Sequence, residues 1–372
     1  TTLSDLAWLR QTVQPMVLTA LLTCTGFSLA QAQELPKMPP GMIGSVSNQL
    51  MKEMKPLDKP LHVKVCIFDI MGRSGPVFTV AQDIAMEARK WNLFVELIAH
   101  TNEGVAAESF RTGQCEGVGI TTLRARMFNP FMGSLDAVGA LPTYEHLKTA
   151  LQILMGSDKT YPLSIHGKYQ IVGLAPLGAA YVMVNDRNIN SVEKAAGKKI
   201  AVLDYDKSQA KMVQQLGAQP VASEVINFGT KFNNGQVDIV VAPAVAYKPL
   251  ELYKGVGAKG GIYRFPLLQL TANIIIRKDK FAPDFGQKSR EYVAKNFKTA
   301  IKQLDQAEKD VPSQTWIDIP PADKDKYYAM MLDARLQLTK EGFYDPKMMK
   351  LLKKVRCSLD KTLGECSDKV EG

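Results

Sequence analysis

Several short segments of the chain combine residue types that could bind a polar or charged solute. The first, Gly72-Arg73-Ser74-Gly75-Pro76, follows an expected strand and opens an expected helix. The backbone N–H groups of such a turn and of the helix N-terminus can receive an anion, with Arg73 as a mobile counter-charge. The alternative is a plain turn in which the glycines supply unusual backbone angles. We take Arg73 and Ser74 as candidate ligand contacts.

Two further candidates follow the third expected strand. Thr121-Thr122-Leu123-Arg124 begins where this strand ends, on the same predicted edge of the sheet as the glycine turn. Ligands of open parallel sheets bind beyond the carboxyl ends of the strands. We therefore expect Thr122 and Arg124 to face a ligand, with an exposed surface arginine as the alternative.

Aspartate and tyrosine side chains follow two strands later in the chain. Asp204-Tyr205-Asp206 lies between an expected strand and a helix that begins near residue 207. One of the aspartates is expected to cap this helix, which leaves Asp204 or Tyr205 for the ligand. Tyr247 follows a later strand, where it could stack on a solute or form a hydrogen bond with it.

The sequence contains no constellation typical of an enzyme, a metal centre or a cofactor site. It has no Cys-x-x-Cys, His-Glu-x-x-His or Gly-x-Ser-x-Gly motif. The histidines are scattered without metal-ligand spacing, and the methionine pairs are expected in helix cores. We therefore expect no catalytic residues, no cofactor and no bound metal. The histidines are His62, His100, His146 and His166.

The elements that must position these segments alternate between strand and helix. The first part of the chain predicts strands at 61–70, 93–100 and 115–121, separated by helices at 77–90 and 103–112. Strand, helix and strand at this spacing indicate a parallel sheet with right-handed crossovers. Residues 61–168 are therefore expected to form a first α/β lobe.

A similar alternation continues after an expected helix at 143–156. We expect a second lobe at residues 169–280 and a helical C-terminal region at 281–372 that packs back on the lobes. The strands expected in the second lobe are 169–175, 179–184, 199–203, 237–242 and 269–276, and the helices expected in and after it are 207–216 and 289–308.

The composition of the 372-residue chain, with 46% hydrophobic and 22% charged residues, provides enough chain for two lobes with their own cores. Disorder as the dominant state is therefore excluded. The net charge is +9, but the 46 basic residues are spread along the chain. The charge gives no specific support for binding to nucleic acid, and we expect no such partner.

The N-terminus has the layout of an export signal. Arg10 is followed by an uncharged stretch over 11–33, and Ala30-Gln31-Ala32 forms an Ala-x-Ala cleavage pattern. We expect residues 1–32 to be a signal peptide cleaved near Ala32, and the mature protein to be periplasmic. A retained membrane anchor and a lipoprotein linked through Cys24 are the alternatives. Residues 33–60 contain five prolines and are expected to be irregular.

Four cysteines remain in the expected mature chain, an even number in a compartment that permits disulfides. Three pairings are possible. The close spacing of Cys357 and Cys366 favours a local link in the C-terminal tail, which leaves Cys66 with Cys115. The alternative is four buried thiols, because cysteine also serves as a small apolar residue in strands.

A series of motifs between 184 and 243 carries a family resemblance. In order these are Asn190-Ser191-Val192-Glu193, Gly197-Lys198-Lys199-Ile200-Ala201-Val202, Leu216-Gly217-Ala218-Gln219-Pro220 and Asn234-Gly235-Gln236-Val237-Asp238. They resemble the second lobe of TRAP-type (DctP-like) solute-binding proteins, in which the pattern dlkGlKiRv … lGA.Pv … l..G.vDg recurs at nearly these intervals. The export signal, the glycine turn and the cysteines make the chain most similar to the AdeT-like solute-binding proteins.

This resemblance implies a fold and a function. The fold is the type II periplasmic-binding-protein fold, with two lobes, mainly parallel sheets, a hinge, and ligand in the cleft between the lobes. The function implied is that of a monomeric receptor that captures a small-molecule solute and presents it to membrane transporter subunits of TRAP or RND type. A periplasmic partner of an RND efflux system, in aminoglycoside resistance, is the alternative. An exported enzyme on the same fold is a further one.

Three positions depart from the family pattern. TRAP receptors hold the carboxylate of an organic acid through the arginine of KiRv, and Ala201 stands at that position. At ungapped spacing, a second family arginine corresponds to Tyr181 and a family asparagine to Ala242. We therefore expect a larger, partly aromatic or multiply functional solute, and we count Tyr181 among its contacts.

Overall fold

The structure is a computed structural model that describes residues 55–368, 370 and 371. The chain divides into two units, Thr1–Lys37 and Met38–Gly372, and every described residue belongs to the second. The expected signal peptide and most of the expected irregular segment lie outside the described residues. Within the described range, no helix is long and apolar enough to cross a membrane.

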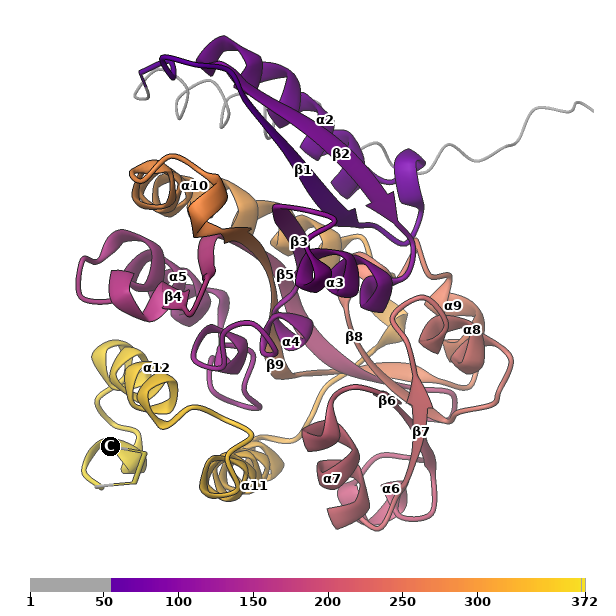
Figure 1. The fold of residues 1–372 in the computed structure, drawn as a ribbon. Coiled ribbons are helices and arrows are strands. Elements are labelled where there is room, and N and C mark those ends of the chain that lie inside the picture. Colours follow the sequence, from indigo (N-terminus) through magenta and orange to yellow (C-terminus); the bar gives the residue numbers. More distant parts are fainter. Residues whose placement is uncertain (1–54, 369, 372) are drawn as a thin grey trace, which may run out of the picture. The chain divides into compact units, whose positions relative to one another are not determined.

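In the described part of the chain, ten strands form one mixed sheet in the order β2-β1-β3-β9-β5-β8-β6-β7, with β10 (Trp316–Ile317) paired to β9 and β4 (Ile165–His166) to β5 (Figure 1). At one end, β1 (Leu61–Phe68) pairs in parallel with β2 (Leu93–His100) and β3 (Gly117–Thr121). We call these three strands the first half-sheet. At the other end, β6 pairs in parallel with β7 and β8, and these three form the second half-sheet. Their bounds are Lys199–Leu203 for β6, Gln219–Ser223 for β7 and Ile239–Pro243 for β8.

Two long antiparallel strands, β5 (Tyr169–Val184) and β9 (Gly261–Arg277), join the half-sheets. Strand β9 continues the first half-sheet through β3, and β5 continues the second through β8. The pairing of β5 with β9 shifts register at four places between Ile171 and Met183. The expected break at 176–178 is therefore wrong, because this segment stays in the strand and its irregularity appears as a shift in register.

The expected helices are present, and their ends follow their capping residues. Helix α3 has the predicted bounds, Glu103–Thr112, because the Asn102 side chain caps its start and Gly113 ends it with φ 87°. The other long helices are α2 (Pro76–Ala88), α5 (Tyr144–Gly156), α7 (Lys207–Gln215), α10 (Phe285–Lys309), α11 (Pro321–Lys340) and α12 (Pro346–Leu359). The short helices are α4 (Thr122–Ala125), α6 (Val192–Ala195), α8 (Phe228–Asn233) and α9 (Leu252–Val256).

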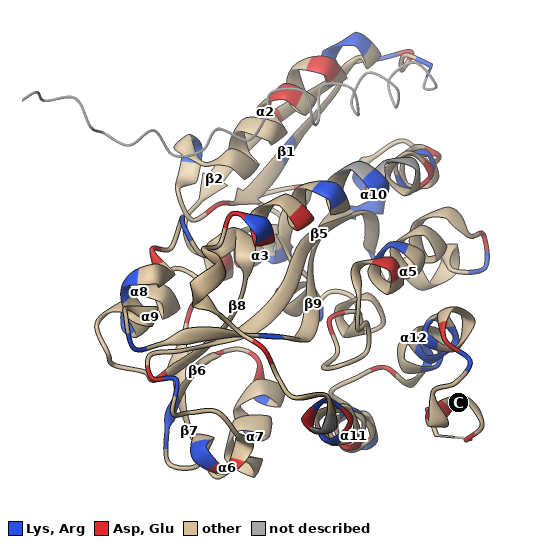
Figure 2. Ribbon diagram, turned by 180° about the vertical axis from the view of Figure 1, so that it is seen from behind, with Lys and Arg blue, Asp and Glu red and all other residues tan. Residues whose placement is uncertain are grey.

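The two half-sheets are packed by largely separate sets of hydrophobic residues. Phe110 of α3, Leu151 of α5 and Met348 of α12 belong to a large core that also includes strands of the first half-sheet. The second half-sheet has one cluster around Ile200 and another around Phe232. Acidic and basic residues are distributed over many elements, as the spread of basic residues in the sequence predicts (Figure 2). The lobe boundaries at 168/169 and 280/281 stay predictions.

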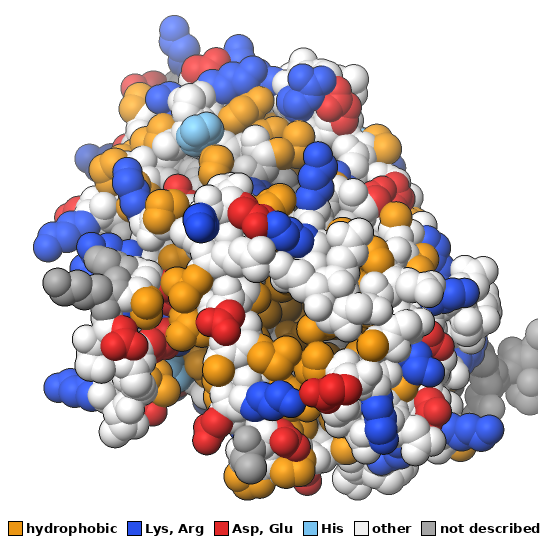
Figure 3. All heavy atoms as spheres, turned by 90° about the horizontal axis from the view of Figure 1, so that it is seen from below, with side chains coloured by type: hydrophobic (Ala, Val, Ile, Leu, Met, Phe, Trp, Pro, Cys, Tyr) orange, Lys and Arg blue, Asp and Glu red, His pale blue; other side chains and the backbone are white. Residues whose placement is uncertain are grey.

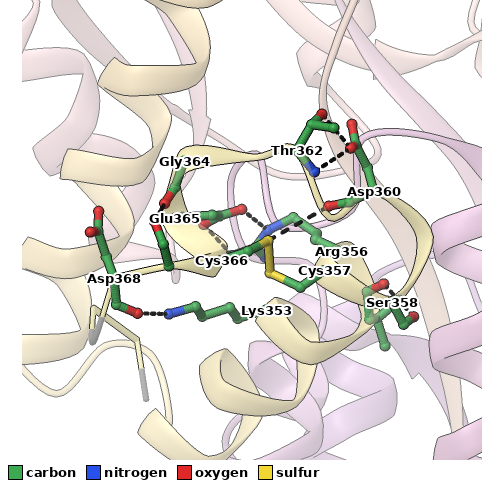
Figure 4. Close-up of a disulfide and its surroundings, with 12 residues drawn as sticks. Lys353, Arg356, Cys357, Ser358, Asp360, Thr362, Gly364, Glu365, Cys366 and Asp368 are labelled. Atoms are coloured by element: carbon green, nitrogen blue, oxygen red, sulfur yellow. Dashed lines mark hydrogen bonds and ion pairs between the residues drawn. A yellow bond between two sulfur atoms is a disulfide. The ribbon is translucent and has the colours of Figure 1, made fainter.

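Both expected disulfides are present, so the alternative of four free thiols is wrong. Cys66 of β1 is bonded to the fully buried Cys115, which precedes β3. Cys357 of α12 is bonded to Cys366 in the C-terminal tail (Figure 4).

Candidate functional site

The glycine turn after β1 is organised around the buried carboxylate of Asp69. Its Oδ2 accepts hydrogen bonds from the backbone N–H groups of Val77 and Phe78, at 2.8 and 3.1 Å, in the first turn of α2. An external anion would therefore compete with the Asp69 carboxylate for the backbone N–H groups at the start of α2. Arg73 and Ser74 are exposed beside this turn. The sequence analysis missed Asp69, although a carboxylate between a strand and a glycine turn is typical of such a cap.

Arg124 and Tyr205 meet between the two half-sheets. The guanidinium carbon of Arg124 lies 3.4 Å from the centroid of the Tyr205 ring. The buried carboxylate of Glu103 accepts a hydrogen bond from the Tyr205 hydroxyl at 3.0 Å and one from the Thr121 N–H at 2.7 Å. Nε of Arg124 lies 3.7 Å from Glu103 Oε2, which is beyond hydrogen-bond length. We call Glu103, Arg124 and Tyr205 the inter-half contact.

The electrostatics of the inter-half contact keep the tyrosine protonated. Burial, together with the neighbouring Glu103 carboxylate, raises the pKa of Tyr205. The hydroxyl therefore remains a donor to Glu103 at neutral pH. Arg124 supplies the opposite charge, and its Nε is buried without a hydrogen-bond partner. The Nε–H group of Arg124 therefore has no acceptor in this conformation, and the guanidinium lies over the Tyr205 ring.

Two more polar contacts link the half-sheets. The Asn102 side-chain amide donates to Glu224 Oε2 at 2.7 Å, and Arg126 Nη1 lies 3.3 Å from Asp206 Oδ1. Asp206 also caps α7 by accepting a hydrogen bond from the backbone N–H two residues on, at 3.0 Å. The prediction that one aspartate of this loop caps the helix is confirmed, and Asp204 is the exposed one.

Thr122 belongs to a buried polar network on β9. Its hydroxyl oxygen lies 2.5 Å from that of Thr271 and accepts a hydrogen bond from the Asn273 amide at 2.5 Å. Thr271 donates to Asp136 through its hydroxyl at 2.6 Å and through its N–H at 2.9 Å. Burial raises the pKa of Asp136 to about 7. Thr122 is fully buried, so a ligand does not reach its hydroxyl in this conformation.

Tyr181 and Tyr247 lie apart from the inter-half contact. Both belong to a hydrophobic cluster on one face of the second half-sheet, together with Ala242, and Ala201 packs against it. The three positions that depart from the family pattern are therefore neighbours in an apolar environment.

The hydroxyl of Tyr181 is already engaged. It donates to Glu308 Oε1 at 2.8 Å, and Tyr144 donates to the same oxygen. The Tyr181 ring packs edge-on against Trp316, with ring centroids 4.9 Å apart. A solute that bonds to the Tyr181 hydroxyl would therefore compete with Glu308, at the end of α10.

The structure thus brings together only part of the expected site. Arg124 and Tyr205 are in contact, Asp204 lies on the same loop as Tyr205, and Thr122 opens the helix that carries Arg124. The sequence analysis missed Glu103, whose place at a helix start after a strand was the available signal. Seen from below, the molecule is hollowed near its centre and hydrophobic side chains line the hollow (Figure 3). Among the described residues, no group of three or more His, Cys, Asp or Glu side chains is placed to hold a metal ion.

Comparison with known proteins identifies close relatives in sequence. The sequence model of a family described as Solute-binding protein AdeT 1/2 matches residues 77–371. The chain is 50% identical over 303 residues to the "Probable solute-binding protein AdeT1" of Acinetobacter baumannii. This alignment covers 81% of the chain and 99% of that protein.

Solved structures show the same fold at low sequence identity. A TRAP periplasmic solute-binding protein from Desulfovibrio salexigens, with bound orotic acid, matches with a TM-score of 0.66 and 14% identity, over 80% of this chain and 99% of that one. Another from Ralstonia eutropha H16, with bound (S)-2-acetolactate, also gives a TM-score of 0.66 and 14% identity, over 81% and 99%. The expected α/β fold of periplasmic binding proteins is confirmed.

Proposed function

The chain belongs to the solute-binding protein AdeT 1/2 family, and from this premise we propose that it captures a small molecule between two lobes and presents it to a membrane transporter. Each lobe contains one half-sheet, and β5 and β9 form the hinge. Family and fold are those of solute-binding proteins, so we propose no catalytic step.

The observation that carries this proposal is the inter-half contact. Arg124 follows β3 and Tyr205 follows β6, so the carboxyl ends of strands from both half-sheets meet there. Ligands of parallel sheets bind at such strand ends. Only the ring stack of Arg124 on Tyr205 and the hydrogen bond from the Tyr205 hydroxyl to Glu103 cross between the halves in this contact, because the long Arg124–Glu103 ion pair lies within the first half. These two interactions can separate while Arg124 and Glu103 stay together.

We propose that the solute is bound mainly around the inter-half contact. Arg124, Tyr205 and Asp204 would contact it directly, with Arg73 and Ser74 on the facing turn. Thr122, Tyr181 and Tyr247 would join this set only after a rearrangement, because their side chains are buried. Orotic acid and 2-acetolactate, bound by the two similar structures, both carry a carboxylate and further polar groups. A multiply functional acid would be held by the Arg124 guanidinium, whose unpartnered Nε is buried in this conformation and would become reachable when the halves separate.

We propose the periplasm as the site of action, after cleavage near Ala32, and a TRAP-type transporter as the partner. The similar structures are TRAP receptors and are periplasmic, which supports both points. An RND efflux system is the alternative partner.

Native mass spectrometry of the mature protein, purified without refolding, tests the proposed function. We expect a co-purified molecule of defined mass that is released on mild unfolding. Tryptophan fluorescence provides a second measurement, because Trp316 packs against Tyr181 while Trp91 lies near β2 in the first half. The absence of any co-purified mass, with unchanged fluorescence on addition of orotate and 2-acetolactate, the ligands of the two similar structures, would contradict the proposal.

A further inference from the structure

Helix α11 contacts the helices α6 and α7 of the second half through partly or largely exposed polar side chains. Apolar contacts accompany them, because Met212 of α7 packs against the large core and Tyr327 and Tyr328 of α11 pack on Phe265 of β9. Lys211 of α7 forms an ion pair with Glu341 at the end of α11. The Gln215 side-chain amide donates to Gln337 Oε1 at 2.8 Å. Near the other end of α11, Lys326 lies 3.0 Å from Glu193 of α6, with both side chains more than half exposed. We call these pairs, between α11 and the helices α6 and α7, the latch.

The same helix is joined to the first half through buried groups. Arg335 of α11 donates through Nη1 to the backbone oxygen of Val138 at 3.1 Å, and Arg356 of α12 donates to that of Ala140 at 2.9 Å. Gly139 lies between these residues with φ 61°, and a side chain there would collide with Met331 of α11. Helix α12 also contributes Met348 and other fully buried residues to the large core.

A buried ionic cluster joins α11 and α12 to the C-terminal tail. The guanidinium of Arg356 pairs with Glu365 and Glu371, both at 2.5 Å, and that of Arg335 pairs with the same two carboxylates at 3.4 and 2.8 Å. We call these four residues the C-terminal cluster. The Cys357–Cys366 disulfide holds the segment that carries Glu365 against α12 (Figure 4).

The two attachments of α11 differ in the burial of their ion pairs, and burial determines which attachment costs less to separate. Exposed ion pairs contribute little, since water and salt replace them at small cost. Buried ion pairs with satisfied hydrogen bonds are expensive to separate, because each partner would be left as an uncompensated charge. An opening motion that must break one attachment will therefore break the latch.

We propose that the described residues of the segment 321–371 form a strap that moves as one body with the first half of the molecule, and that the latch is the contact released when the second half turns away. This inference rests on the proposed function, because it requires the two halves to move about β5 and β9. The strap lies across both halves, so the latch adds to the inter-half contact in holding the closed form.

Distance measurements by electron paramagnetic resonance test this proposal on the full mature chain. Spin labels attached to a non-natural amino acid leave the two disulfides intact. They are placed in pairs at three exposed positions: Gln152 of α5, Gln214 of α7 and Asp333 of α11. We expect two distances for 152/214 and for 214/333, and a single narrow distance for 152/333. Lys211→Ala is expected to raise the ratio of long to short distances about two- to fivefold.

A matched control separates the latch from a general loss of surface charge. Lys254→Ala removes an exposed ion pair with Glu251 that lies within α9 and its cap, so the distances should stay unchanged. A change as large as that of Lys211→Ala would overturn the latch. A single distance for 214/333 with two for 152/333 would overturn the strap and leave the hinge intact. A single distance for 152/214 in every variant would overturn the hinge motion of the proposed function itself.

Discussion

The inter-half contact and the C-terminal cluster use the same types of residue and differ in geometry. In the C-terminal cluster, the guanidinium of Arg356 contacts Glu365 and Glu371 at 2.5 Å, and its side chain is 2% exposed. In the inter-half contact, Arg124 reaches Glu103 only at 3.7 Å, and 16% of its side chain is exposed. The first arrangement fixes a segment permanently. In the second, the stack of Arg124 on Tyr205 and one hydrogen bond from Tyr205 to Glu103 cross between the halves, and we propose that these form and separate.

This difference shows that residue type alone does not tell a fixed arginine from a movable one. What separates them is the number of hydrogen bonds that each guanidinium makes and the covalent link nearby. Arg356 donates to two carboxylates and to the Ala140 oxygen, and the next residue forms a disulfide. Arg124 instead makes one long ion pair with Glu103 and stacks on the ring of Tyr205.

The largest effect is expected from Arg356→Ala, which tests whether the C-terminal cluster is fixed. The change leaves the carboxylates of Glu365 and Glu371 buried without their main partner. We expect a loss of about 3–5 kcal/mol in the free energy of unfolding, measured by urea denaturation. Arg111→Ala removes an exposed pair with Glu108 and should cost less than about 1 kcal/mol. Equal losses in the two variants would show that the buried C-terminal cluster contributes no more to stability than an exposed ion pair.

The next effect concerns the disulfide beside the cluster. Replacing Cys357 and Cys366 by serine frees a short loop in the unfolded chain, with a separation of 9 residues between the cysteines. We expect a loss of about 2–3 kcal/mol from chain entropy, measured as a shift of the urea midpoint. Full stability in the double variant would mean that the four ionic groups hold the tail without the covalent link.

A third prediction concerns Asp136, two residues before Val138, which Arg335 contacts. Its pKa is raised by burial to about 7 in the folded protein, against 3.8 for the ordinary group. The folded state therefore binds the proton more tightly than the unfolded state, and its contribution to stability falls as pH rises from about 4 to about 7. The slope is at most about 1.4 kcal/mol per pH unit.

Chemical denaturation at pH 5, 6 and 7 measures this slope, with Asp136→Asn as the matched variant. The amide cannot ionise, so the difference in unfolding free energy between wild type and variant should change with pH in this window. A constant difference would show that Asp136 does not titrate there.

The smallest effect is expected from Tyr205→Phe in the inter-half contact. The variant keeps the stack on Arg124 and loses one hydrogen bond to Glu103. We expect thermal unfolding to show a loss of about 1.5 kcal/mol in the free energy of unfolding, the lower end of the range for a hydrogen bond to a charged group, because Glu103 keeps the bond from the Thr121 N–H. Tyr253→Phe is the control, because that hydroxyl is exposed and lies 3.4 Å from Glu251. A loss for Tyr205→Phe comparable to that of Arg356→Ala would place both regions in one rigid body and remove the contrast between them.

Much of the fold could be predicted because its signals are local. The bounds of β2, β6 and α3 follow from alternating apolar residues, from Asn102 at a helix start and from Gly113 at a helix end. Strand β7 was missed because it is short and contains Pro220. The continuity of β5 was missed because Pro176 and Gly178 are typical of a break, whereas pairing with β9 keeps them in the strand.

The candidate site was predicted less well because its contacts join distant parts of the chain. The Tyr205 hydroxyl bonds to a residue 102 positions away in the sequence, and no local pattern carries that information. Tyr181 was chosen from its place in a family pattern, and its hydroxyl is engaged by Glu308 of a helix far along the chain. Arg124 and Tyr205 were found because both directly follow strands, which is where topology gathers side chains.

The register shifts in β5 have a mechanical consequence. A ladder of hydrogen bonds is stiff against shearing within its own plane, while bulged positions bend and twist with less resistance. All four shifts of β5 against β9 fall in the stretch of β5 from Ile171 to Met183, and the β9–β5 pair lies between β3 and β8 in the sheet order. In the proposed hinge motion, bending at these positions would therefore be directed out of the plane of the two strands, so the halves would move about one axis.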